Sequence, residues 1–296
     1  MPIADELKQS FKMGGVVTRL IYINIGVFLV VRILYAVYTL TFNDPYFPLT
    51  HWLSVPASPE NLIFQPWSLI TYMFLHFEFM HILFNMLTLF WFGRIFLQYF
   101  NPRQLLGVYF MGGISGALLY ILSYNLFPAL QNFAPSAIMM GASASVMAII
   151  FASAKYSPNF KVHLLLIGPV KLIHLAIALL IMDVIGVGAM NNTGGHLAHI
   201  GGALFGLFFA SRVIKGKDIT MKFNRFMDNF VSIFSRKPKM KVTHTTNKRP
   251  MSDMEYNAQK RKKQSNIDHI LEKIKASGYD SLTKQEKEDL FNASNN

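Results

Sequence analysis

Six apolar stretches, joined by short polar connections, constrain the fold of this chain more than any other feature. A helix needs about 20 mostly apolar residues to cross the ~30 Å hydrocarbon core of a membrane. The stretches approach or reach this length at about residues 20–40, 79–99, 105–126, 138–154, 172–189 and 196–214. Charged residues make up 15% of the chain, compared with about 25% in soluble domains. The sequence therefore predicts an all-α, polytopic membrane protein with six transmembrane helices.

The connections between these stretches alternate in charge. Lys and Arg residues occur in 94–104 and 155–171, whereas 41–66, 127–137 and 183–195 contain none. Because cytoplasmic loops carry an excess of Lys and Arg, both termini are expected in the cytoplasm. We expect a multi-pass protein of the bacterial cell (inner) membrane.

Most of the positive charge follows the last apolar stretch. Nineteen of the 28 Lys and Arg residues occur from Arg212 onward, and the whole chain has a formal net charge of +12. Basic clusters beside a membrane typically bind anionic headgroups. We therefore expect the lipid bilayer as a partner and no nucleic acid. The chain has no cysteine, which excludes disulfides and thiolate metal ligands.

The sequence divides into four regions. These are a cytoplasmic N-terminus (1–19), a membrane domain (20–214), a basic cytoplasmic linker (215–264) and a small cytoplasmic two-helix module (265–296). In the module, Gly278 interrupts the helical pattern, and Thr283 with Glu286 predicts a capping box for the second helix. The module has no catalytic constellation, so residues from 220 onward are expected to be dispensable for chemistry.

Polar residues cluster near the N-terminal ends of the second, fourth and sixth stretches. The second contains His81 and Asn85, the fourth Ser143 and the sixth His199. These three helices are expected to enter the membrane from the same side, which brings the four side chains to one depth. A serine hydroxyl becomes a strong nucleophile when an imidazole accepts its proton, and N–H donors stabilise the oxyanion that follows. The four residues therefore indicate hydrolysis of an amide bond.

Each of these groups has a simpler explanation when taken alone. The Gly-Ala-Ser-Ala run at 141–144 is more often a helix-packing motif than a nucleophile site. Gly202 and Gly206 lie on one helix face with His199 and favour close packing, which would bring His199 to Ser143. A lone histidine within a membrane is costly and favours a functional role. The combination, in this order and at this depth, is what predicts a site.

With these motifs the chain resembles the rhomboid family of intramembrane serine proteases over about residues 60–212. The resemblance implies a six-helix rhomboid-like bundle that hydrolyses peptide bonds in or near transmembrane segments, with single-span membrane proteins as substrates. It implies a Ser-His dyad without a third acid, in which Ser143 is the nucleophile and His199 the general base. It also implies that the side chains of His81 and Asn85 and the backbone N–H of Ser143 hold the oxyanion. We expect no cofactor and no metal.

The resemblance also assigns supporting positions and contains two departures. The supporting residues are His76, Gly141, Gly202 and Gly206. The glycine that usually follows the serine is Ala144 in this chain, and the usual Trp-Arg pair is Trp67-Ser68. Neither departure removes a chemical group from the reaction.

Three other polar residues near the predicted site have weaker interpretations. Ser145 is a rival nucleophile, but it is expected to face another side of its helix. His196 is a rival base that is expected closer to the surface. Asp183 would suit proton coupling in a transporter, but it is expected to reach the membrane interface.

Two other kinds of protein are alternatives to a serine protease. A zinc protease is disfavoured because His76, Glu78 and His81 lack the spacing of a helical two-histidine zinc site. A catalytically inactive rhomboid-like binding protein or a transporter remains the alternative to a serine protease. In the protease, the uncharged connection 186–195 is expected to act as a mobile cap over the site. A plain surface loop is the alternative for this connection.

Overall fold

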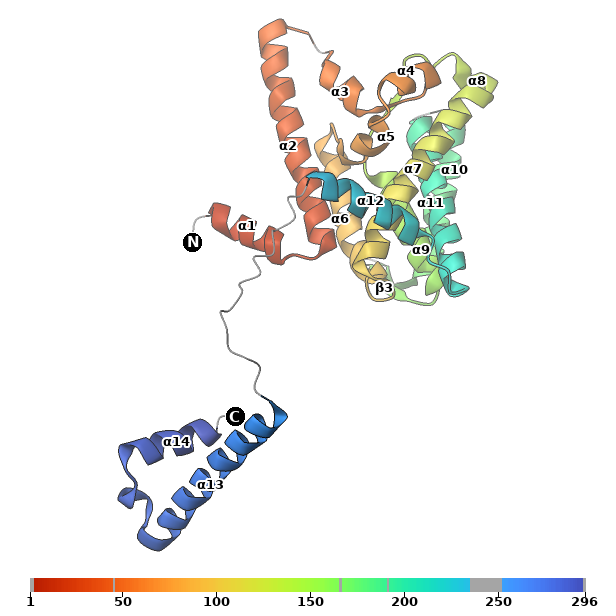
Figure 1. The fold of residues 1–296 in the computed structure, drawn as a ribbon. Coiled ribbons are helices and arrows are strands. Elements are labelled where there is room, and N and C mark those ends of the chain that lie inside the picture. Colours follow the sequence, from red (N-terminus) through yellow and green to blue (C-terminus); the bar gives the residue numbers. More distant parts are fainter. Residues whose placement is uncertain (1–2, 45, 165–166, 191, 235–251, 295–296) are drawn as a thin grey trace. The chain divides into compact units, whose positions relative to one another are not determined.

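The structure is a computed structural model, and it describes residues 3–44, 46–164, 167–190, 192–234 and 252–294. The chain forms two compact units, residues 1–236 and 237–296. Figure 1 shows that the first unit is a bundle of helices and that the second consists of α13 and α14. Helices dominate both units, which confirms the predicted all-α class.

Six apolar helices form the core of the first unit. They are α2 (Val16–Phe42), α6 (Phe79–Phe96), α7 (Pro102–Leu126), α9 (Ser143–Tyr156), α10 (Leu172–Gly188) and α11 (Thr193–Ile214). Within the described residues, four of them (α2, α6, α7 and α11) are long and apolar enough to cross a membrane. The other two, α9 with 14 residues and α10 with 17, are apolar but shorter.

Short elements connect these helices or flank them. They are α1 (Ile3–Met13), α3 (Pro48–Leu53), β1 (Val55–Pro56), α4 (Pro59–Phe64), α5 (Ser68–Thr71), η1 (Tyr72–Phe74), α8 (Pro128–Gln131), β2 (Ile138–Met139), β3 (Lys161–Leu164), β4 (Gly168–Lys171) and α12 (Thr220–Phe234). Strands β3 and β4 form an antiparallel hairpin between α9 and α10.

Helix α9 lies at the centre of the bundle. All of its residues from Ala144 to Ala154 are buried, as expected for a helix that is apolar on every side. Small residues on α7 and α11 make this possible. A Cβ at Gly112 would overlap the Cβ of Ala148, and a Cβ at Gly206 would overlap the carbonyl oxygen of Ala148. The neighbouring helices therefore approach the backbone of α9 directly.

The start of α9 differs from the prediction. The sequence places a helix from 138, but the structure has an extended segment there, because β2 pairs with β1 in antiparallel register (Val55 with Met139). Gly141 then adopts a φ of +124°, a conformation that favours glycine. The helix begins only at Ser143.

The connection between α10 and α11 is shorter than predicted. Helix α10 continues to Gly188 and α11 begins at Thr193, so only residues 189–192 lie between them. The extent expected for the cap, 186–195, was therefore wrong, because all four of its glycines lie within α10 or α11. Its role as a mobile cap stays a prediction.

The region expected to be a linker (215–264) contains regular structure at both ends. Helix α12 packs against α7, where the Nδ2 of Asn224 donates a hydrogen bond to the carbonyl oxygen of Arg103 at 2.9 Å. The side chain of Thr220 fills the space over Gly107. Helix α13 already starts at Asp253, twelve residues before the module predicted at 265–296.

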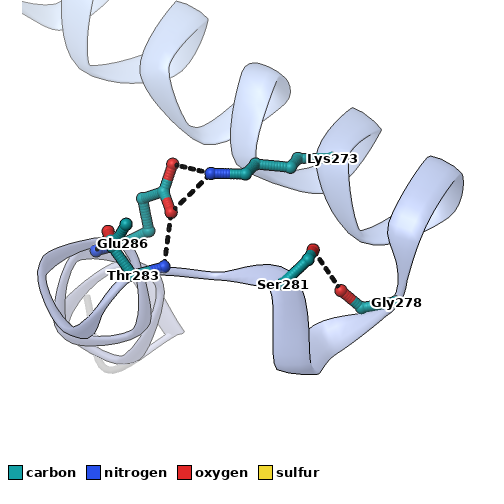
Figure 2. Close-up of polar contacts among 5 residues, drawn as sticks. All are labelled: Lys273, Gly278, Ser281, Thr283 and Glu286. Atoms are coloured by element: carbon teal, nitrogen blue, oxygen red, sulfur yellow. Dashed lines mark hydrogen bonds and ion pairs between the residues drawn. The ribbon is translucent and has the colours of Figure 1, made fainter.

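The second unit is a pair of helices, α13 (Asp253–Ser277) and α14 (Lys284–Ser294), joined by η2 (Tyr279–Ser281). Lys273 on α13 donates hydrogen bonds to both carboxylate oxygens of Glu286, at 2.8 and 2.9 Å (Figure 2). The backbone N–H of Thr283 also donates to Glu286, and that of Glu286 to the Thr283 hydroxyl, so the predicted capping box is present. These contacts and the buried Ile270 hold the two helices together.

Candidate active site

A cavity of about 1250 Å³ opens among α6, α9, α10 and α11. Polar side chains on its wall include His81, Asn85, Ser143, Asp183, His196 and His199. The structure thus brings the four side chains predicted from the sequence to one cavity, together with two that were assigned elsewhere. Ser145 is fully buried and is not among the lining residues.

Ser143 is half-buried at the first position of α9. The N–H groups in the first turn of a helix have no intrahelical partner, and the helix dipole favours negative charge there. The backbone of Gly141 is fixed by its N–H, which donates to the carbonyl oxygen of Tyr72 at 2.9 Å. The serine therefore lies beside backbone donors that suit an oxyanion.

His76 and His81 support the turn before Ser143. The backbone N–H of Ala142 donates to Nε2 of the fully buried His76 at 3.3 Å. The His76 and His81 rings meet edge to face, with centroids 5.1 Å apart. A Cβ at Gly141 would lie 2.8 Å from Cε1 of His81. Glycine at 141 is therefore required both by its backbone conformation and by the imidazole against it.

Asn85 lies one helical turn after His81 on α6. Its Nδ2 donates one hydrogen bond to the carbonyl oxygen of His81 at 2.9 Å. The side chain is nearly buried but borders the cavity. Because an amide group has two N–H bonds, one remains to point at a ligand.

His199 has a carboxylate partner, which differs from the expectation. Its Nδ1 lies 2.8 Å from Oδ1 of Asp183, and Nδ1 of His196 lies 2.8 Å from the same oxygen. Asp183 is buried, with 5% of its surface exposed. Asp183, which was expected to reach the membrane interface, is thus buried beside the predicted base. The predicted dyad without a third acid stays a prediction. Asp183 shares a helix face with the buried Leu172 and Ala176, and that face packs against α11.

The same three residues are also the place where a metal ion could bind. Their nitrogen and oxygen atoms lie within 4.8 Å of one another, and two imidazoles with one carboxylate are common zinc ligands. At 2.8 Å, however, both nitrogen–oxygen pairs have the length of charge-assisted hydrogen bonds.

Ser143 and His199 face the same cavity from α9 and α11. Within the part of the chain that the structure describes, no hydrogen bond joins their side chains. Hydrogen bonds between reacting groups are often long without substrate and shorten only when it binds.

Close packing of α9 and α11 sets the distance between these two residues. A Cβ at Gly202 would overlap the carbonyl oxygen of Ala144. A Cβ at Gly116 on α7 would lie 2.6 Å from the Cβ of Ala144. Glycines on two neighbouring helices thus make room for alanine after the serine.

The second departure from the rhomboid pattern lies in the connection between α2 and α6. Nε1 of Trp67 donates to the carbonyl oxygen of Trp52 at 2.9 Å, and the two indole rings stack with centroids 5.4 Å apart. Ser68 is fully buried. In this connection Trp67 therefore contacts a second tryptophan, Trp52.

Comparison with known proteins assigns the first unit. A model of the rhomboid domain matches residues 64–216, just over half of the 296 residues. The chain belongs to the rhomboid family. The bundle of apolar helices is therefore a rhomboid-like membrane domain, and the protein is a multi-pass membrane protein.

Two relatives of this rhomboid protein are mitochondrial by name. RHOMBOID-like protein 12, mitochondrial, of Arabidopsis thaliana is 27% identical over 71% of this chain and 61% of its own length. Presenilin-associated rhomboid-like protein A, mitochondrial, of Danio rerio is 27% identical over 55% of this chain and 40% of its own length. The chain thus spans less than two thirds of either relative. These names give no support to the expected bacterial inner membrane.

The C-terminal part of this rhomboid protein matches a second family. Residues 252–296 match a family of unknown function (DUF6576). The match begins at Ser252, which caps α13, so it coincides with the helical pair of the second unit.

Proposed function

We propose that this rhomboid protein is an intramembrane serine endopeptidase that cleaves membrane proteins in or near their transmembrane segments. The observation that carries the proposal is the common cavity, with Ser143 at the N-terminus of α9 and His199 on the adjacent α11. Membership of the rhomboid family supports the same activity.

In the proposed reaction, Nε2 of His199 accepts the hydroxyl proton of Ser143 while Oγ forms a bond with the carbonyl carbon of the substrate. The carbonyl oxygen becomes an oxyanion, and donors near Ser143 stabilise it. These donors are the backbone N–H of Ser143 and the side chains of His81 and Asn85. His199 then gives the proton to the leaving nitrogen as the C–N bond breaks. Water releases the acyl group by the same steps in reverse.

The proposed substrates are single-span membrane proteins. A transmembrane helix satisfies its own backbone hydrogen bonds, so the scissile segment must unwind before its carbonyl can reach Ser143. A cavity of about 1250 Å³ has room for an unwound segment of a few residues. Support for the cytoplasmic location of both termini comes from the charge of the connections.

The test combines labelling with cleavage by the full-length protein in liposomes. A fluorophosphonate should label the wild-type protein at Ser143 and stop its cleavage of a single-span substrate. Ser143→Ala and His199→Ala should each abolish cleavage, and the double variant should be no worse than either, because the two residues act as a unit.

A Ser143→Ala variant with full activity would contradict the proposal. An unlabelled, inactive wild-type protein that still binds single-span proteins would instead favour the inactive binding protein. Chelation of metal ions with phenanthroline should leave cleavage unchanged. Loss of cleavage in the presence of phenanthroline would favour metal-dependent chemistry.

A further inference from the structure

Arg32 is a charged residue well inside the apolar helix α2. The other charged residue of this helix, Arg19, lies near its start. Arg32 lies about 24 Å along the helix from the first residue, Val16, because each helical residue adds about 1.5 Å. If α2 enters the ~30 Å hydrocarbon core at Val16, the backbone of Arg32 is still about 6 Å inside the opposite boundary. A charge at that depth is costly and is kept where another group pairs with it.

The guanidinium of Arg32 lies against two aromatic rings. Its Cζ is 4.6 Å from the ring centroid of Phe77 and 5.3 Å from that of Tyr35. The two rings themselves meet edge to face, with centroids 4.8 Å apart. Cation–π contacts hold the charge in place but give its N–H groups no oxygen or nitrogen acceptor. Among the described residues, none accepts a hydrogen bond from this guanidinium or forms an ion pair with it, so it can still bind an anion.

A cavity of about 520 Å³ adjoins the guanidinium between α2 and the start of α6. Its volume is in the range of about 300–1,000 Å³ that is typical of ligand pockets. The lining residues are Phe28, Arg32, Phe77, Glu78 and Phe79. Glu78 directly precedes α6, but its exposed side chain makes no capping hydrogen bond. No ion pair joins it to Arg32 in the described parts of the chain. The cavity therefore offers one cation and one anion to a ligand.

We propose that this cavity binds the headgroup of phosphatidylethanolamine from the surrounding bilayer. The phosphate would pair with the planar guanidinium of Arg32, which suits two parallel hydrogen bonds. The ammonium group would donate hydrogen bonds to the carboxylate of Glu78. Basic pockets between membrane helices bind lipid headgroups in this way. The inference goes beyond the proposed function and does not depend on it.

The face of α2 that carries Arg32 also suits the acyl chains of such a lipid. Phe28 and Leu29 lie one turn before Arg32 and Ile25 lies two turns before it, so all of them share its face. Ile25 and Leu29 are exposed. A lipid whose phosphate lies at Arg32 can therefore place its chains along these apolar side chains, toward the interior of the bilayer.

The two opposite charges select this headgroup over other common ones. Phosphatidylglycerol is anionic and would place no cation beside Glu78, so the carboxylate would repel it. Phosphatidylcholine has a positive nitrogen but no N–H group to donate to a carboxylate. Only a headgroup with both a phosphate and a primary ammonium group satisfies both side chains.

The proposed lipid site lies next to the candidate active site. Phe77 and Glu78 line the 520 Å³ cavity and also the larger cavity that contains Ser143. A bound headgroup would thus contact a wall that the two cavities share.

The test measures lipid binding to the purified full-length protein by native mass spectrometry. The protein in detergent is titrated with phosphatidylethanolamine, phosphatidylcholine or phosphatidylglycerol with identical acyl chains, and the Kd of the first bound lipid is determined. Phosphatidylethanolamine should bind at least about tenfold more tightly than the other two, as expected for hydrogen bonds between charged groups.

Three variants locate the binding. Arg32→Met keeps an apolar side chain of similar length and should weaken binding of phosphatidylethanolamine by at least about tenfold. Glu78→Gln should abolish the preference for phosphatidylethanolamine over phosphatidylglycerol. Arg94→Met is the matched control and should bind as the wild type does, because Arg94 also lies over an aromatic ring, with its Cζ 4.1 Å from the centroid of Phe90, but does not line this cavity.

Each result either supports the site or overturns it. Equal affinity of the wild type for the three lipids would contradict the proposal. Wild-type affinity for phosphatidylethanolamine in Arg32→Met would place the bound lipid elsewhere. An unchanged preference in Glu78→Gln would show that the carboxylate does not select the headgroup. If thermal unfolding shows that Arg32→Met is not folded, Glu78→Gln decides alone. The proposed protease is tested separately, by labelling of Ser143.

Discussion

Asn85 and His81 occupy neighbouring turns of α6 but differ in how they are held. Asn85 is tied to its own helix by the hydrogen bond to the His81 carbonyl oxygen, whereas the His81 ring is held between His76 and Gly141. Both side chains border the cavity at positions determined by packing. Donors of this kind need no reorganisation when an oxyanion forms.

We predict that Asn85→Ala and His81→Ala each lower kcat by about 10²–10³-fold, the usual effect of removing one oxyanion donor. The measurement is steady-state cleavage in liposomes, with kcat and KM determined separately. Thr88→Ala is the control. Thr88 borders the same cavity, but its hydroxyl donates to the carbonyl oxygen of Phe84, so its loss should leave kcat unchanged. A rise in KM alone would make Asn85 and His81 substrate-binding residues.

The sequence was sufficient to bring Ser143, His199, His81 and Asn85 to one place, because three parallel helices carry them at corresponding ends. It missed the contact between Asp183 and His199 for a physical reason. A hydropathy average treats one acid among apolar residues as a small penalty and contains no information on direction. The signal was present in the face that Asp183 shares with Leu172 and Ala176.

Among the elements, α9 shows where an apolar pattern is ambiguous. The stretch from 138 to 154 is apolar throughout, and periodicity alone cannot separate an extended segment from a buried helix. Two features make residues 138–142 non-helical. They are the pairing of Ile138 with Pro56, which is distant in sequence, and the positive φ of Gly141. The helix was predicted, but its first residue was not.

The contact between α9 and α11 leads to a prediction at this scale. Gly202→Ala places a methyl group against the Ala144 carbonyl oxygen and should lower the free energy of unfolding by about 1–3 kcal/mol. Activity should fall with it, because the two helices carry Ser143 and His199. Gly26→Ala on α2 is the control, since a Cβ there meets no atom within 4 Å. Thermal unfolding in detergent measures the effect, and equal stability of both variants would contradict it.

The helical pair of the second unit should lose stability in acid. Hydrogen bonds from Lys273, and then from the backbone N–H of Thr283, lower the pKa of Glu286 to about 2. A carboxylate with a lowered pKa in the folded state stabilises that state above its unfolded pKa, and the contribution disappears as pH falls through the folded pKa. Protection of residues 253–294 from amide hydrogen exchange, corrected for intrinsic rates, should therefore fall between about pH 4.5 and 2. Glu286→Gln should remove this dependence, and Glu288→Gln on the exposed side of α14 should retain it.

For the whole molecule, the first compact unit extends to residue 236, beyond the end of the membrane domain predicted at 20–214. Helix α12 packs against α7 through Asn224 and Thr220, although its polar residues had made the region look like linker. A hydropathy average identifies segments that are apolar enough to cross a membrane. It does not identify a more polar helix, such as α12, that packs against one of these segments. The two-helix module, by contrast, was recognisable because its caps and spacing are local.

We predict that a chain ending at residue 236 cleaves substrate at the wild-type rate, because all the described residues that line the cavity belong to the first unit. A chain ending at residue 219 lacks α12 and should be less stable, by an amount that thermal unfolding in detergent would detect. The sequence predicts that residues from 220 onward are dispensable for chemistry. With α12 packed against α7, we expect residues 237–296 to be dispensable for both activity and stability. A well-folded chain ending at 236 without activity would show that the second unit acts in catalysis.

The length of α9 has a consequence for where cleavage occurs. A helix of 14 residues is about 21 Å long, whereas the hydrocarbon core is about 30 Å thick. If its C-terminal end lies level with one headgroup layer, its first residue stops about 9 Å short of the other. Ser143 would thus lie at the bottom of a shallow well, within reach of water from above. Peptide bonds near the end of a substrate helix would meet the nucleophile, while bonds at the bilayer midplane would pass below it.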